Sequence, residues 1–198
     1  EVQAKMGQPG DALKTLKAGI PESGAADPDL MGLIGAMIAQ AGDLSDARTY
    51  FEQVASARPQ DAIARARLGV ARIALGDSAG GIADLDAAAA LDGALWQVDF
   101  ARAVAFLRLN DFSQALAAAR RMQASQPDNP YAAILIGVAE SATGALTEAK
   151  QAFENALLLR PGDGIALRNL AALAVRQQRF DEARRYYDLL IAASPGDP

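Results

Sequence analysis

The side chains able to do chemistry in this sequence are carboxylates, guanidinium groups and lysine amines, because the chain has no histidine and no cysteine. That composition leaves no histidine general base, no Ser-His-Asp relay, no thiolate nucleophile and no zinc site built from the usual ligands. Three acids, Asp84, Asp86 and Asp92, invite comparison with a calcium site. They stand at helical spacing and lack the alternating oxygen ligands of a calcium-binding loop. We therefore predict no catalytic activity, no cofactor and no metal.

The balance of charge and hydrophobicity limits the class of partner. The 198 residues include 24 Asp and Glu against 19 Lys and Arg, a net charge of −5. Nucleic-acid binding needs clustered Lys and Arg to neutralise phosphates, so we predict no nucleic-acid partner. The longest apolar stretch, from Leu30 to Gly42, is far shorter than the roughly 20 residues that cross a bilayer. We therefore predict no direct membrane insertion by this segment.

One phrase recurs along the chain at a fixed distance. It occurs as SDARTYFEQVASARPQD, as ALTEAKQAFENALLLRPGD and as FDEARRYYDLLIAASPGD. The small residue in each phrase is Ala47, Ala149 or Ala183, and the intervals are 183 − 149 = 34 and 149 − 47 = 102, which is three times 34. This register predicts five copies and one partial copy, over 28–61, 62–95, 96–129, 130–163, 164–197 and 1–27.

Each copy has the signals of two helices joined by a turn. In the first copy, apolar residues spaced by three and four predict one face of a helix. Gly42 suits the left-handed conformation that closes helices, the following Asp43 can cap the next helix, and Pro59 ends it. The equivalent closing residues are Gly76, Asn110 and Gly144, whereas the last copy has Gln178, which gives no such signal. Gly80 and Gly81 fall inside a predicted helix, so we expect copy 62–95 to be the segment of lowest local stability.

A 34-residue period with small, bulky and proline positions at these offsets resembles the tetratricopeptide repeat, a helix–turn–helix unit. The resemblance covers nearly the whole chain. It implies an all-α fold, a right-handed α-solenoid of stacked antiparallel helix pairs that forms one continuous domain. An alanine-rich bundle or coiled coil is the rival fold, but it would need heptad spacing and no proline every 34 residues. The partial copy over 1–27 would supply a second helix and a linker.

The resemblance also implies where a partner would bind. In tetratricopeptide repeat proteins the first helices line a groove that binds an extended or helical peptide, through the second, fifth, sixth, ninth and twelfth positions of each copy. The Lys-and-Asn clamp of the chaperone-docking members is absent here. We predict an apolar groove centred on 96–163 that takes an apolar strand or an amphipathic helix. The open alternative is that the ninth and twelfth positions are mostly helix–helix core.

Arginines could add a basic strip to this groove, although arginines on helix faces are usually only solvated. The strip would contain Arg67, Arg108, Arg168 and Arg176. The full set of predicted partner-binding residues is Ile63, Arg67, Phe100, Val104, Leu107, Arg108, Tyr131, Ile134, Val138, Arg168 and Asn169.

These features predict a non-enzymatic scaffold for a protein or peptide partner. The stretch from Trp96 to Ala139, with its QPDNP turn, is also similar to the long bacterial repeat lipoproteins of exosortase and exopolysaccharide export. That similarity implies a periplasmic or outer-membrane-associated scaffold in polysaccharide export or protein sorting. The alternatives are an accessory array of a larger transferase or hydrolase, and a cytoplasmic location, since no leader is visible. Phe180, Tyr187 and Ile191 in the last predicted helix suggest a longer array or self-association through that helix.

Overall fold

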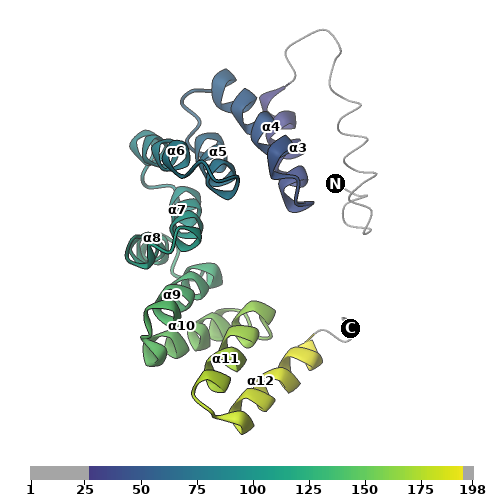
Figure 1. The fold of residues 1–198 in the computed structure, drawn as a ribbon, viewed down its shortest axis with the longest axis vertical. Coiled ribbons are helices and arrows are strands. Elements are labelled where there is room, and N and C mark those ends of the chain that lie inside the picture. Colours follow the sequence, from purple (N-terminus) through teal and green to yellow (C-terminus); the bar gives the residue numbers. More distant parts are fainter. Residues whose placement is uncertain (1–26, 194–198) are drawn as a thin grey trace. The chain divides into compact units, whose positions relative to one another are not determined.

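The computed structural model describes residues 27–193, and all regular structure in that range is helical (Figure 1). The partial copy predicted over 1–27 therefore lies outside the described residues, apart from Asp27. The first helices of the pairs are α3 (Pro28–Gln40), α5 (Ala62–Ala74), α7 (Trp96–Arg108), α9 (Pro130–Thr143) and α11 (Gly164–Arg176). The second helices are α4 (Leu44–Ala57), α6 (Ser78–Leu91), α8 (Phe112–Ser125), α10 (Leu146–Leu159) and α12 (Phe180–Ala193).

The helices keep the period of the sequence. Successive first helices begin 34 residues apart, as in 62 − 28 for α5 and α3, and so do successive second helices, as in 78 − 44 for α6 and α4. The prediction of an all-α fold made of helix pairs is confirmed. None of the helices between residues 27 and 193 has the length and apolarity needed to cross a membrane.

The turns inside the pairs follow the capping signals of the sequence. Asp43 and Asp77 accept hydrogen bonds from backbone N–H groups three residues on, at 3.1 and 2.9 Å, and so cap α4 and α6. Gly42 closes α3 with a positive φ of 91°, and Asn110 adopts φ 58° at the equivalent place. Gln178 adopts the same φ of 58°. The turn geometry of the pair therefore holds even where the residue type gives no signal for it.

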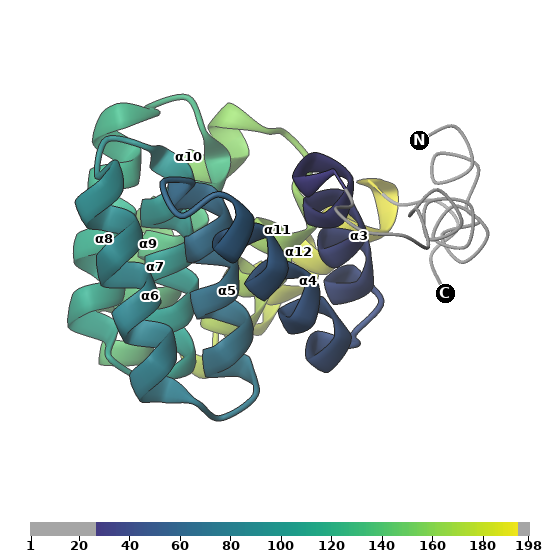
Figure 2. The same ribbon diagram turned by 90° about the horizontal axis from the view of Figure 1, so that it is seen from above.

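The chain forms two compact units that divide within α7, one up to Ala101 and one from Arg102. In the first unit, α3 packs on α4, α4 on α5 and α5 on α6; Ile34 and Leu85 are completely buried there. In the second unit, α9 packs on α8 and α10, and α10 and α12 both pack on α11 (Figure 2). Phe153 lies at the centre of the second core, 0% exposed.

The two helices of a pair approach closely at the eighth residue of the copy. A Cβ added to Gly35 would lie 2.8 Å from the ring of Phe51, and one added to Gly137 would lie 2.6 Å from the ring of Phe153. In the α5–α6 pair the backbones themselves meet, because Gly69 faces a second glycine. A Cβ on Gly81 would lie 2.4 Å from Ile73 Cγ1 and 2.6 Å from the carbonyl oxygen of Gly69.

These contacts give Gly81 a packing role that the sequence did not reveal. From helix propensity alone, glycine in a helix costs about 1 kcal/mol relative to alanine. Here the missing side chain lets two backbones touch, and the whole of Leu85 is buried beside them. The expectation that copy 62–95 has the lowest local stability stays a prediction, because it concerns the local opening of its helices.

We predict that Gly81→Ala destabilises the chain by about 1–3 kcal/mol, because the methyl group has no room beside a backbone carbonyl. Gly32→Ala is the matched control. Gly32 also lies inside a helix, but its added Cβ would meet only the Arg67 guanidinium, at 3.8 Å. This control should stabilise the chain by up to about 1 kcal/mol. Urea denaturation of both variants measures the difference, and equal gains in stability would contradict the packing role of Gly81.

A charged contact joins the second helices of the last two pairs. The Lys150 ammonium on α10 donates a hydrogen bond to the Glu182 carboxylate on α12, and the Tyr186 hydroxyl donates to the same carboxylate at 3.3 Å. The Lys150 hydrogen bond lowers the pKa of Glu182 below its ordinary value, although burial acts in the opposite direction. The same hydrogen bond raises the pKa of Lys150.

Because the pKa of Glu182 is lower in the folded chain, this contact should stabilise fully above the ordinary carboxyl pKa and weaken as the pH falls through the lowered one. We predict that Glu182→Gln costs about 1 kcal/mol near pH 7 and that the cost shrinks between about pH 5 and pH 3. Glu154→Gln, which removes a more exposed partner 3.8 Å from Lys150, should have little effect. Urea denaturation at about pH 7 and at about pH 3 measures the loss of stability in each variant. A loss for Glu182→Gln that is the same at the two pH values would contradict the assignment.

Candidate partner-binding surface

All of the predicted partner-binding residues lie on first helices of the pairs. Ile63 and Arg67 belong to α5, and the remaining residues belong to α7, α9 and α11. Their exposure differs widely. Arg67, Arg108 and Arg168 are exposed and Tyr131 is 38% exposed, whereas Ile134 is only 5% exposed. The partly buried members are Ile63, Phe100, Val104, Leu107, Val138 and Asn169.

Ile134 is part of the core of the second unit. It packs in the same cluster as Phe153 and Leu170, and Val138 packs against the edge of that cluster. At these fifth and ninth positions, helix–helix packing therefore takes most of the side chain. What Ile134 can offer to a partner is correspondingly small.

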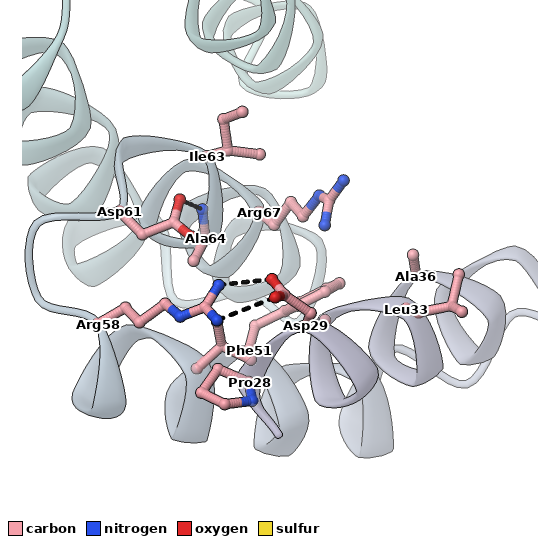
Figure 3. Close-up of a pocket in the computed structure, with 12 residues that line it drawn as sticks. Pro28, Asp29, Leu33, Ala36, Phe51, Arg58, Asp61, Ile63, Ala64 and Arg67 are labelled. Atoms are coloured by element: carbon pink, nitrogen blue, oxygen red, sulfur yellow. Dashed lines mark hydrogen bonds and ion pairs between the residues drawn. The ribbon is translucent and has the colours of Figure 1, made fainter. Parts of the chain in front are cut away.

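The first unit contains a pocket of about 230 Å³ between α3 and α5 (Figure 3). Gly32, Leu33 and Ala36 of α3 form one side of it, and Phe51 and Val54 contribute from α4. The other lining residues are Pro28, Asp29, Arg58, Asp61, Ile63, Ala64 and Arg67. The pocket thus combines an apolar surface with four charged side chains.

Two of those charges neutralise each other. Both terminal guanidinium nitrogens of Arg58 contact the Asp29 carboxylate, with Nη2 to Oδ2 at 3.0 Å, as Figure 3 shows. The Arg58 hydrogen bond holds the pKa of Asp29 below its ordinary value. Asp61 is occupied as well, because its Oδ1 accepts a hydrogen bond from the Ala64 N–H at 2.9 Å and caps α5.

Arg67 is different. Its exposed side chain extends from α5 towards α3 over the pocket (Figure 3). Its Nη1 lies 3.8 Å from the point where a Cβ on Gly32 would stand. Among residues 27–193 it forms no ion pair or hydrogen bond, so its guanidinium is available to a ligand.

In the second unit an arginine stands at the same place as Arg58, but it contacts a tyrosine where Arg58 contacts an aspartate. Tyr131 stands where Asp29 stands one hundred and two residues earlier (131 − 29 = 102), and Arg160 takes the place of Arg58. The Arg160 guanidinium lies 4.9 Å from the centre of the Tyr131 ring and 3.3 Å from its hydroxyl. It also contacts the carboxylate of Asp163, the cap of α11, at 3.4 Å. Arg160 therefore links Tyr131, at the start of α9, to the cap of α11 in the next helix pair.

Sequence reasoning did not single out Arg58 and Arg160. The available signal is that both precede the proline that ends a second helix, and both stand three residues before a capping Asp, in RPQD and RPGD. An arginine at this place can reach back to the second residue of its own copy. Only the structure shows that it does.

Asp84, one of the acids that invite a calcium reading, is buried in the first unit. Its carboxylate accepts hydrogen bonds from Arg65 at 3.2 Å and from Arg72 at 2.7 Å, and Arg72 also contacts Glu52. The side chain of Asp84 is therefore neutralised by its own unit. Within the described range, no three His, Cys, Asp or Glu residues are grouped so as to hold a metal ion.

Solved structures with the same fold come from several bacteria. TTC0263, a thermophilic TPR protein of Thermus thermophilus, is 20% identical with a TM-score of 0.78, over 86% of this chain and 93% of that one. Pseudomonas aeruginosa pilF is 19% identical with a TM-score of 0.73, over 86% and 78%. MamA of Desulfovibrio magneticus RS-1 is 19% identical with a TM-score of 0.67, over 84% and 94%. At these identities the likeness establishes the fold alone.

Comparison with curated proteins gives no match. The sequence model of the tetratricopeptide repeat, in contrast, matches three stretches that together span well over half of the chain, at residues 39–95, 100–149 and 143–198. With the helix pairs at their 34-residue spacing, this match shows that the chain belongs to the tetratricopeptide repeat family.

Proposed function

We propose that the chain is a non-enzymatic scaffold that binds a segment of another protein along its first helices. The observation that carries this proposal is the exposure of large apolar side chains on first helices within each unit. Leu33 of α3 is 51% exposed, Tyr131 of α9 is 38% exposed and Ile165 of α11 is 42% exposed. The stack is closed by small residues elsewhere, so these side chains are not needed to hold it together and can contact a partner.

The double variant Tyr131→Ala and Phe100→Ala tests the proposal. We predict that it loses at least about tenfold in capture of the partner from native extract while keeping the helical content of the wild type, because both side chains lie on first helices. Leu158→Ser, which changes an 81% exposed residue on α10, is the control and should capture the partner normally. Quantitative pull-down measures capture, and circular dichroism measures the fold. Unfolding of the double variant, or normal capture by it, would contradict the assignment.

We also propose that this scaffold acts in a bacterial envelope system for polysaccharide export or protein sorting, in the periplasm or at the outer membrane. The similarity of residues 96–139 to repeat lipoproteins of such systems supports this, and a chain without cysteine is compatible with an oxidising compartment. Cell fractionation of the native protein tests the location. We expect it with the periplasmic or outer-membrane fraction. Recovery in the cytoplasm, or joined to a transferase or hydrolase domain, would instead favour the alternatives.

Self-association through α12 is the remaining part of the proposal. Phe180, Tyr187 and Ile191 on this helix are 64%, 45% and 70% exposed. Tyr187 occupies the register position at which Phe51 and Phe153 are buried in earlier pairs. A second copy covering this face would bury these side chains, and sedimentation over a range of concentrations distinguishes that association from a chain that stays monomeric.

A further inference from the structure

The pocket between α3 and α5 exists because two positions of α3 hold small residues. Gly32 and Ala36 are the fifth and ninth residues of the first copy. The same positions of α9 hold Ile134 and Val138, and Ile134 is buried in the core of its unit. The first unit therefore leaves open a space that side chains occupy at the equivalent place in the second unit.

The charge at the rim of the pocket also differs between the units. Arg67 corresponds in register to Asn169 of α11, since 169 − 67 = 102. Asn169 donates its side-chain amide to the carbonyl oxygen of Ile165 at 2.8 Å, within its own helix. Arg67 has no such internal partner among the described residues, whereas the other charged residues of the pocket, Asp29, Arg58 and Asp61, are all engaged.

The size of the pocket limits what can enter it. Sites for small molecules usually measure about 300–1,000 Å³. A pocket of about 230 Å³ is smaller and suits a single apolar side chain. Leu33, Phe51 and Val54 offer that side chain an apolar wall, and the Arg67 guanidinium stands beside it with a fork of donors that matches a carboxylate.

We propose that this pocket selects a protein segment that presents an acidic side chain next to an apolar one. The apolar side chain enters between Gly32 and Ala36, and the carboxylate pairs with Arg67. This inference rests on the proposed function, because it names the chemistry of the segment that the first helices bind. It commits to a protein segment as the ligand, since the pocket is continuous with the partner-binding face that Ile63 and Arg67 share on α5.

Selection from a random twelve-residue peptide library displayed on phage tests the proposal with the full chain as bait. We expect the enriched peptides to carry Asp or Glu beside Leu, Ile or Phe. The enriched peptide, made synthetically and labelled, is then titrated against variants that copy the second unit. Arg67→Asn reproduces Asn169 and Ala36→Val reproduces Val138, so both residue types are already accommodated at these positions of the fold.

Each of these variants should weaken binding of the peptide by about tenfold or more, because one removes the charge partner and the other fills the pocket. Arg67→Lys should recover part of the affinity, because it restores the charge without the fork. Arg184→Asn, at an exposed arginine on the second helix α12, should bind as the wild type does. The advantage of the acidic peptide over its Gln counterpart should fall as salt is raised.

Two outcomes would overturn the inference and leave the proposed function standing. One is enrichment of peptides that carry no acidic residue. The other is that Arg67→Asn and Ala36→Val bind the peptide with wild-type affinity, although the Tyr131 and Phe100 double variant no longer captures the native partner. If the double variant captures its native partner normally, the proposed function fails instead. Thermal unfolding of every variant shows whether a loss of binding reflects the pocket or the fold.

Discussion

The close approach of the two helices within each pair is the constraint on which the rest of the structure depends. At the eighth residue of the first, second and fourth copies there is no room for more than a small side chain, because the facing position on the second helix holds a buried phenylalanine or leucine. Gly137 faces Phe153, which is completely buried and has nowhere to move. Where alanine replaces glycine, at Ala103 and Ala171, it too is fully buried. Each pair can stack on the next only because it closes tightly here.

This constraint leaves other positions of the first helices free to vary. The second, fifth and ninth residues of a copy lie outside this closest approach, and their residue types differ between copies. The first copy has Gly32 and Ala36 and a pocket, whereas the fourth has Ile134 and Val138 and a filled core. A repeat protein can therefore change its binding surface without changing its stack. In such a chain, the functional signal lies in the departures from the repeat.

The sequence predicted the helix pairs well because their signals are local. Glycine, aspartate and proline at fixed offsets fix the turns, and the 34-residue period appears without any knowledge of contacts. Contacts between residues far apart in the chain were beyond its reach. Helix propensity made Gly81 a weak point, but its place against Gly69 depends on how α5 and α6 pack. Likewise, no local pattern reveals that Gln178 takes a left-handed turn, because the pair around it imposes that geometry.

The site was less predictable for the same reason. Register positions carried over from the family placed the predicted residues on first helices, but they could not say that Ile134 is buried and Arg67 exposed. Nor could they find Arg58 and Arg160, because each acts on a residue 29 positions earlier. Pairing across such distances is decided by side-chain reach in the folded copy. This pairing can be recognised only in the folded structure, where the end of one helix lies beside the start of another.

Charge offers a last test of whether such a surface can discriminate between ligands. The chain is acidic overall, with a net charge of −5, and this would oppose an acidic ligand at long range. Screening limits that repulsion to about 8 Å at physiological salt. At contact distance the local pattern decides. Of the two arginines that line the pocket, Arg58 is neutralised by Asp29, whereas Arg67 forms no ion pair with any residue between 27 and 193. Arg67 is therefore the charged side chain of the pocket that is left to bind a carboxylate. The acidic background slows the approach of carboxylate-bearing segments in general, while that guanidinium prolongs the stay of those whose carboxylate reaches it, so discrimination comes mainly from the rate of dissociation.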